Sequence, residues 1–126
     1  MKTIIFILLV LFSLEAFAQD IKEYQWKNRL LVLVSNASNS SEVNQQHKIF
    51  EQKEPQLLER DILLLKRQPE SQDLAHFSLK TNFEGVLLIG KDGGIKLKKP
   101  FIVEPQVIFD LVDSMPMRKA EIRSKY

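Results

Sequence analysis

The sequence predicts an α/β protein built on a mixed four-stranded sheet flanked by helices. Short apolar runs alternate with segments of helical pattern, as is typical of buried strands in an α/β sheet. An Asp-Gly pair lies between two later strand-like runs, and it predicts an antiparallel hairpin. Removing 18 of the 126 residues leaves 108, enough for one hydrophobic core and too few for two domains.

The first 18 residues have the three parts of a cleavable export signal. Lys2 provides a positive start, residues 4–12 are apolar, and Ala16-Phe17-Ala18 has the small-x-small form of a signal-peptidase site. The apolar stretch has about ten residues, whereas a membrane-spanning helix needs ~20. We therefore expect cleavage after Ala18, no transmembrane segment in the mature chain, and a secreted or periplasmic location. An uncleaved membrane anchor is the alternative.

The first strand and the first helix are predicted at Arg29–Val34 and Glu42–Lys53. The strand RLLVLV reads as an apolar run, as expected where both faces of a sheet are covered. After a polar loop, Ser40 or Ser41 can cap the helix, and Glu42 suits the positive end of the helix dipole. The apolar stripe of this helix is thin and consists of Val43, Ile49 and Phe50.

The second strand is predicted at Asp61–Lys66, after Pro55 has ended or kinked the first helix. A turn-rich connection over residues 67–72 leads to Ser71, which can cap a short helix. The apolar residues of that helix are Leu74 and Phe77.

The third and fourth strands, Gly85–Ile89 and Ile95–Lys98, form the predicted hairpin. A type I′ turn at Asp92-Gly93 would supply the positive φ angles that a tight hairpin needs. Lys96 and Lys98 alternate with apolar residues, so the fourth strand has one solvated face and a protected sheet edge.

A last helix is predicted from Pro105, and residues 116–126 form a basic tail that is frayed or loosely docked. The domain then spans residues 19–115. The order β-α-β-α-β-β-α makes the first two strands parallel, through a right-handed crossover, and the last two antiparallel. The apolar stripe of the last helix is Val107, Ile108, Leu111, Val112 and Met115.

This order, together with Val86 to Ile95 (VLLIGKDGGI), resembles the thioredoxin fold of peroxiredoxins and thiol-disulfide exchange proteins. The resemblance implies that the family's cysteines would lie within residues 35–41, and its cis-proline at Glu84. The chain has no cysteine, so thiol redox chemistry, thiolate metal sites and a lipid-anchored cysteine are excluded.

Four segments also resemble a family of exported domains of unknown function. Such domains occur as small bacterial proteins, as the terminal module of sushi-repeat-containing secreted proteins and in a coiled-coil-domain matrix protein of animals. The resemblance implies a thioredoxin-like fold without redox cysteines and adhesive or matrix-associated roles in the animal members. It brings no catalytic residues. The segments are Trp26–Leu30, Glu59–Asp61, Ile89–Lys96 and Met115–Arg118.

The polar loop carries two glycosylation sequons, at Asn36 and Asn39, which matter in a eukaryotic secreted protein. The short signal and the stand-alone domain favour a bacterial protein, in which we expect no modification. A loop serine, such as Ser38, would need an oriented base to act as a nucleophile. His47 shares the helix face of Val43, so we favour a packing role for it, and we expect His76 to face solvent.

Charged and aromatic residues supply the other candidates. We favour an ion-paired cap for Glu59-Arg60-Asp61 over a polar binding site. The lysines of the hairpin and the basic tail can bind acidic polymers or anionic lipid, but edge protection and solubility explain the same residues. We expect Trp26 to pack over the core, with exposed recognition as the alternative. The hairpin lysines are Lys91, Lys96, Lys98 and Lys99.

The sequence as a whole favours a non-enzymatic, redox-inactive binding module. We expect no cofactor, no metal, and a partner that is an unknown protein or an envelope or matrix component. The net charge of +2 gives little support to nucleic-acid binding. The alternatives are a cysteine-independent hydrolase or transferase that uses the loop serines with His47, and a basic module that docks acidic glycan or lipid. The candidate binding residues are Asn36, Ser38, Arg60, Asp61, Lys91, Lys96 and Arg118.

Overall fold

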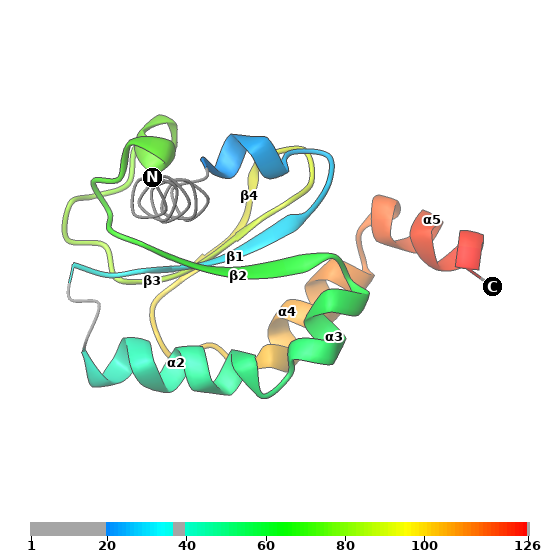
Figure 1. Ribbon diagram of the computed structural model, residues 1–126, viewed down its shortest axis with the longest axis horizontal. Coiled ribbons are helices and arrows are strands. Elements are labelled where there is room, and N and C mark those ends of the chain that lie inside the picture. The colour runs from blue at the N-terminus through cyan, green and yellow to red at the C-terminus, as the bar shows by residue number, and fades with distance from the viewer. Residues whose placement is uncertain (1–19, 37–39, 126) are drawn as a thin grey trace, which may run out of the picture.

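The computed structural model describes residues 20–36 and 40–125 (Figure 1). The predicted signal peptide and Ser38 lie outside these residues. The centre of the fold is a four-stranded sheet of order β2-β1-β3-β4. β1 pairs in parallel with β2 and antiparallel with β3, and β3 pairs antiparallel with β4, which confirms the mixed sheet. The strands are β1 (Arg29–Val34), β2 (Ile62–Arg67), β3 (Gly85–Ile89) and β4 (Ile95–Lys99).

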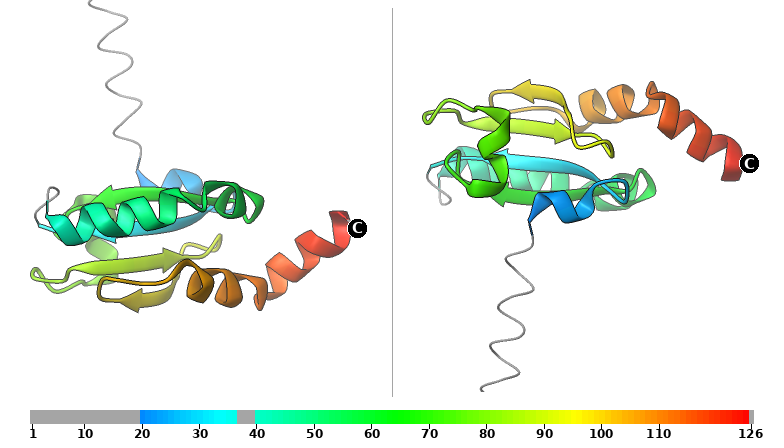
Figure 2. Two further views of the ribbon diagram at one scale, coloured as in Figure 1. Left: turned by 90° about the horizontal axis from the view of Figure 1, so that it is seen from below. Right: turned by 90° about the horizontal axis from the view of Figure 1, so that it is seen from above.

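Helices cover both faces of this sheet. α2, α3 and α4 lie on one face, and the 3-10 helices η1 (blue) and η2 (green) lie on the other (Figure 1). Figure 2 shows α2 and α3 across β1 and β2, while α4 crosses β3 and β4. The helices are η1 (Ile21–Tyr24), α2 (Ser41–Glu51), α3 (Glu54–Glu59), η2 (Gln72–Phe77), α4 (Pro105–Asp113) and α5 (Pro116–Lys125).

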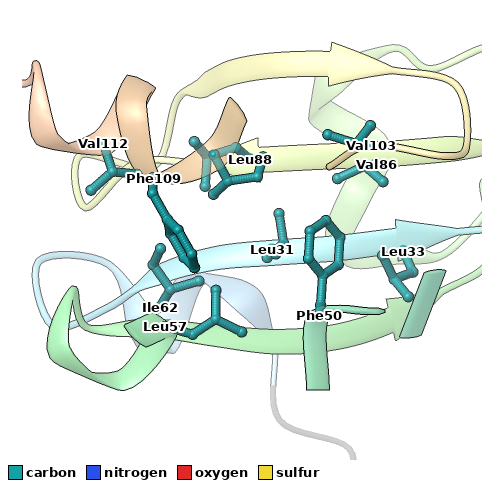
Figure 3. Close-up of a cluster of buried hydrophobic side chains, with 11 residues drawn as sticks. Leu31, Leu33, Phe50, Leu57, Ile62, Val86, Leu88, Val103, Phe109 and Val112 are labelled. Carbon is teal, nitrogen blue, oxygen red and sulfur yellow. The ribbon is translucent and has the colours of Figure 1, made fainter. Parts of the chain in front are cut away.

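Alternate residues of β1 enter two separate cores, which explains why the strand is apolar from Leu30 to Val34. Leu31 and Leu33 face the α2 side, where Phe50 of α2 and Phe109 of α4 pack against them and their neighbours (Figure 3). Burial of each such side chain contributes about 1.5–3 kcal/mol to stability. The second core lies under η1 and η2 and consists of Ile21, Leu30, Val32, Val34, Leu74, Leu87 and Ile89.

The buried polar residue of α2 is Gln46, and the predicted packing of His47 is wrong. Val43, Gln46 and Phe50 are buried because a spacing of three and four residues follows one helix face. Gln46 bonds both backbone groups of Val103: its Nε2 donates to the carbonyl at 2.9 Å, and its Oε1 accepts from the N–H at 2.6 Å. His47 is one position further round, half-exposed, and 3.1 Å from Glu51. His76 is exposed, as expected.

Of the two predicted caps for α2, the structure confirms Ser40. Its side chain accepts a hydrogen bond from the Val43 N–H at 3.3 Å. In α4 the predicted stripe is partly wrong, because Val107 is exposed and Phe109 is buried. Pro105, Ile108 and Val112 define the face that meets the sheet, and Phe109 follows Pro105 by four residues on that face.

Residues 90–94 connect β3 and β4 without the predicted type I′ turn, and the Gly90 N–H donates to the Gly94 carbonyl at 2.9 Å, which leaves a three-residue loop, residues 91–93. Of the loop residues 91–93, only Gly93 has positive φ, at 88°, whereas a type I′ turn needs two such residues. The Gly93 N–H donates to the Gly90 carbonyl at 3.0 Å. Glycine at the left-handed position of such a loop lets the strands keep their right-handed twist.

Residues 116–125, expected to be a frayed tail, form helix α5 instead. Its first two turns place Arg118, which is buried, and Glu121 against the end of the sheet. No helix in the described part of the chain is long and apolar enough to cross a membrane.

Candidate functional site

Eight charged residues meet at the end of the sheet where β1 and β2 begin and β3 ends. They come from the start of β1, the α3–β2 junction, the hairpin loop, α4 and α5, so chain segments far apart in sequence converge there. We call this group the charged cluster. Its members are Arg29, Glu59, Arg60, Asp61, Lys91, Asp113, Arg118 and Glu121.

Arg29 is the buried centre of the charged cluster. It is the first residue of β1, and only 1% of its surface is exposed. Its Nη1 and Nη2 donate to the two carboxylate oxygens of Glu121, each at 3.2 Å, and Nη1 also donates to the Arg60 carbonyl at 2.8 Å. A two-point arginine–carboxylate pair adds directional hydrogen bonding to the attraction of the charges and so fixes both side chains.

Lys91 joins the hairpin loop to the charged cluster. Its Nζ lies 2.6 Å from Glu121 Oε1 and 2.9 Å from Asp61 Oδ2, and its side chain is 10% exposed. The lysine therefore stands between two carboxylates from different elements. It is held within the fold and does not extend an open basic surface.

Arg60 and Arg118 share the carboxylate of Asp113. Arg60 donates to both oxygens at 2.9 Å, and Arg118 Nε donates at 3.4 Å. The Arg60 guanidinium also lies 4.4 Å from the centre of the Phe109 ring, a cation–π contact with a core residue. Arg118 donates to the backbone carbonyl of Glu59 and to the carboxylate of Glu59. The charged cluster thus continues directly into the hydrophobic core.

The arginines and lysine keep the carboxylates of the cluster ionised. Hydrogen bonds from Arg60 outweigh burial and hold the pKa of Asp113 below its ordinary value. Burial by itself raises the pKa of Glu121, but hydrogen bonds and charge from Lys91 and Arg29 exceed that effect, so its pKa is also lowered. Both pKa shifts mark stabilising ion pairs, and neither marks a proton donor ready for catalysis.

Two residues beside Lys91 have left-handed backbone conformations. Asp61 has φ of 54°, and its carbonyl accepts from the Arg29 N–H at 2.8 Å. Trp26 has φ of 69°, and its N–H donates to the Lys91 carbonyl at 2.6 Å. Left-handed backbone is unfavourable for residues other than glycine and is concentrated at functional sites.

Trp26 is 64% exposed, so the expectation that it packs over the core is wrong. The residue that packs is Tyr24, which is half-buried against the core under η1. Large aromatic side chains are enriched at protein interfaces, so the exposed Trp26 is a candidate recognition residue.

A cavity of about 220 Å³ opens beside the charged cluster. Its lining includes Arg29, Lys91 and Lys96 together with Met115 to Met117. Lys96 bonds Asp92 at 2.8 Å, and this bond, with the Gly94 N–H, keeps the pKa of Asp92 low. The lining therefore combines paired cations with apolar side chains that include the exposed Met117.

The structure brings together four of the sequence-predicted residues: Arg60, Asp61, Lys91 and Arg118. Lys96 lies at the cavity beside them. Asn36 follows β1 at the opposite end of the sheet, where its Nδ2 donates to the Thr81 carbonyl at 3.1 Å. Ser38 lies outside the described residues. The residues that sequence reasoning missed are Arg29, Asp113 and Glu121.

Two described serines of the polar loop, Ser35 and Ser40, have structural roles. Ser35 is buried, and its hydroxyl donates to Glu84 at 3.0 Å. Ser40 caps α2, and His47 lies about two turns further along that helix, ~10 Å away along its axis. The geometry gives no support to a pairing of Ser35 or Ser40 with His47. Across residues 20–36 and 40–125, no group of three or more histidines or acids is placed to hold a metal ion.

A family model described as a domain of unknown function (DUF4174) matches residues 20–121. The match includes all eight members of the charged cluster and both left-handed residues beside it. It agrees with the expectation of an uncharacterised domain. No curated protein and no solved structure matches the chain significantly.

Proposed function

The chain belongs to the DUF4174 family of domains of unknown function, and from that premise we propose that it is a redox-inactive, non-enzymatic binding module. We propose further that it is exported, that it has a thioredoxin-like fold, and that it binds a protein or matrix component of the envelope. The binding face is the sheet end that carries Trp26, the hairpin loop and Met117.

The element order supports the thioredoxin-like part of this proposal. A parallel pair joined through a helix is followed by an antiparallel hairpin and a helix, as in the expected order. On the register of that resemblance, Ser35 stands in the region of the redox cysteines and Glu84 at the cis-proline position. These two side chains hydrogen-bond to each other, so these two positions form an internal contact in this chain.

The exposure of Trp26 is the observation that carries the binding role. An indole that is 64% exposed adds little to the core, and its left-handed backbone costs free energy. The exposed indole and its strained backbone lie at the same end of the sheet as the charged cluster, whose eight side chains support that end. A rigid aromatic residue beside paired charges suits a protein–protein contact, in which aromatic and arginine side chains dominate the binding energy.

The mutual pairing of the charges favours binding over catalysis. Each of the four cations in the charged cluster already contacts a carboxylate within the described chain. An acid or base that is held in this way is a poor proton carrier, whereas a preorganised surface loses little entropy when it binds.

Site-specific photocrosslinking tests the binding face. A photoreactive residue at position 26 should capture one dominant partner from the cell envelope, whereas the same residue at Val107, an exposed apolar position on α4, should not. Trp26→Ala should weaken binding to the identified partner at least tenfold, with Val107→Ala as the matched control. Equal crosslinking at both positions would contradict the proposed face.

Two further measurements test the remaining parts of the proposal. Insulin-reduction and peroxidase assays should give background rates, and clear turnover in either would overturn the non-enzymatic reading. Amino-terminal sequencing of the protein recovered from the envelope should begin at Gln19, and a chain that begins at Met1 would contradict export through a cleaved signal.

A further inference from the structure

The two edges of the sheet are protected very differently. β4 carries Lys96, Lys98 and Lys99, which is a common defence of an exposed edge. β2, at the other edge, has four consecutive apolar residues, Ile62–Leu65, and carries charge only at its end, at Lys66 and Arg67. An unprotected apolar edge of this length pairs readily with another strand.

The edge of β2 is also the floor of a groove of about 490 Å³. Tyr24 borders the groove from the η1 side of the sheet, and Glu51, Glu54 and Leu58 border it from the α2–α3 side. Leu58 is 53% exposed. A strand edge between two walls is the shape that accepts an added extended strand.

The backbone bonds between β1 and β2 show which residues of β2 face outward. The Arg29 N–H donates to the Asp61 carbonyl at 2.8 Å, and the Ser35 N–H donates to the Arg67 carbonyl at 3.1 Å. Odd-numbered residues of β2 therefore direct their backbone groups to β1, because the direction alternates along a strand. The backbone groups of Ile62, Leu64 and Lys66 point away from the sheet. The Lys66 carbonyl also accepts from Arg67 Nη1 at 2.8 Å, which leaves its second lone pair for an added strand.

We infer that β2 pairs antiparallel with β2 of a second copy of this chain. The pairing that uses all three outward residues has Leu64 opposite Leu64, and Ile62 opposite Lys66, across a two-fold axis. It also brings Leu63 against Leu65 on the η1 face. The two sheets then form one continuous eight-stranded sheet, and this dimer forms independently of the proposed Trp26 face.

Charge complementarity favours a second copy of this chain as the occupant of the groove at the β2 edge. Directly opposite residues lie on the same face of a sheet, so Lys66 of one copy lies beside Ile62 of the other, on the α2–α3 side. That side carries Glu51 and Glu54 at the groove wall. Within the part of the chain that the structure describes, neither Lys66 nor Glu54 forms an ion pair. Lys66 of one copy can therefore pair with Glu51 or Glu54 at the groove wall of the other copy.

Sedimentation equilibrium of the full chain tests the dimer. We expect a monomer–dimer equilibrium between low micromolar and several hundred micromolar protein. Leu64→Lys places two lysines on the two-fold axis and should abolish dimers. Lys66→Glu sets like charges against the acidic wall and should weaken the dimer about tenfold. The double variant Glu54→Lys/Lys66→Glu should restore it, which keeps the test valid if Leu64→Lys unfolds the chain.

Lys98→Glu is the matched control, because it changes an exposed lysine on the opposite edge strand, and it should leave dimerisation unchanged. Hydrogen exchange gives a second readout: the amides of Leu64 and Lys66 should gain protection as protein concentration rises, while those of Leu63 and Leu65 stay protected throughout. A chain that is monomeric at every concentration overturns the proposal and assigns the groove to an extended segment of another protein. A dimer that Leu64→Lys and Lys66→Glu leave unchanged also overturns it.

Discussion

At the scale of single residues, Arg29 does more than any other side chain to join the sheet to the charged cluster. Its guanidinium is buried and bonds Glu121 at two points. We predict that Arg29→Met destabilises the protein by about 3 kcal/mol, because the mostly covered Glu121 carboxylate keeps only Lys91 and Arg118 as cationic partners and the Arg60 carbonyl loses its donor. Urea denaturation at neutral pH measures this effect. Arg123→Met, an exposed change on α5, is the control and should cost less than about 0.5 kcal/mol.

The left-handed backbone of Trp26 leads to a second prediction. Glycine accepts this conformation without strain, whereas a β-branched residue does not. Trp26→Gly should therefore cost no stability, and Trp26→Val should lower the free energy of unfolding by about 1–2 kcal/mol. Thermal denaturation of the two variants checks this. If the glycine variant were strongly destabilised, the indole would be serving the fold and the binding role would lose its support.

The sequence identified part of the charged cluster for a clear reason. Arg60, Asp61, Lys91 and Arg118 are charged residues within segments that carry a family resemblance. Arg29 lies in one of these segments as well, but it was read as the start of an apolar run, and its partner Glu121 is 92 positions away in a segment expected to be a tail. Ion pairing between residues so far apart in sequence depends on how α5 packs against the sheet. A local sequence pattern does not predict that packing.

At the scale of elements, apolar runs gave the strands within one residue, because burial on both faces leaves little freedom at a strand end. The helix faces were harder to predict. A helix with few apolar residues fits more than one stripe, and the sheet decides which one is buried. In α2 the sheet selected Gln46 over His47, and in α4 it selected Phe109 over Val107.

Gln46 fastens the segment between β4 and α4 to α2. It satisfies both the N–H and the carbonyl of Val103, which lie in a buried loop position. We predict that Gln46→Leu lowers the free energy of unfolding by about 2–4 kcal/mol, since it leaves two buried backbone groups without partners. Gln45→Leu is the matched control, because it makes the same change at an exposed neighbour. Equal stability of the two variants would show that Val103 finds other partners.

At the scale of the whole molecule, the charged cluster makes stability depend on pH. The pKa values of Asp113 and Glu121 are lower in the folded protein than their ordinary values of 3.8 and 4.5. The unfolded chain therefore binds more protons in this range, and stability falls as pH decreases. We predict full stability above about pH 5 and a steady loss below it. Thermal denaturation between neutral and acid pH measures this loss.

Variants of these two acids separate the cluster from the rest of the chain. Asp113→Asn and Glu121→Gln should be less stable at neutral pH and should show a weaker decline toward acid pH. Glu104→Gln changes an exposed carboxyl outside the cluster and should keep the wild-type decline. If the two cluster variants declined as steeply as the wild type, acid destabilisation would have to arise elsewhere in the molecule.

The position of α5 decides where the domain ends. A chain ending at Met115 keeps the predicted domain of residues 19–115 but loses Arg118 and Glu121, so Arg29 stays buried without its carboxylate. We predict that this truncation lowers the free energy of unfolding by about 3 kcal/mol or more, comparable with Arg29→Met.

A chain ending at Ile122 is the control for the truncation. It keeps Arg118 and Glu121, and its free energy of unfolding should fall by less than about 1 kcal/mol, since only an exposed helix end is removed. Arg29→Met combined with the truncation at Met115 should cost little more than the truncation alone, because the truncation already removes the Arg29–Glu121 pair, together with the contacts of Arg118. Urea denaturation of the four chains tests this, and additive losses would show that Arg29 stabilises the protein mainly through contacts other than Glu121.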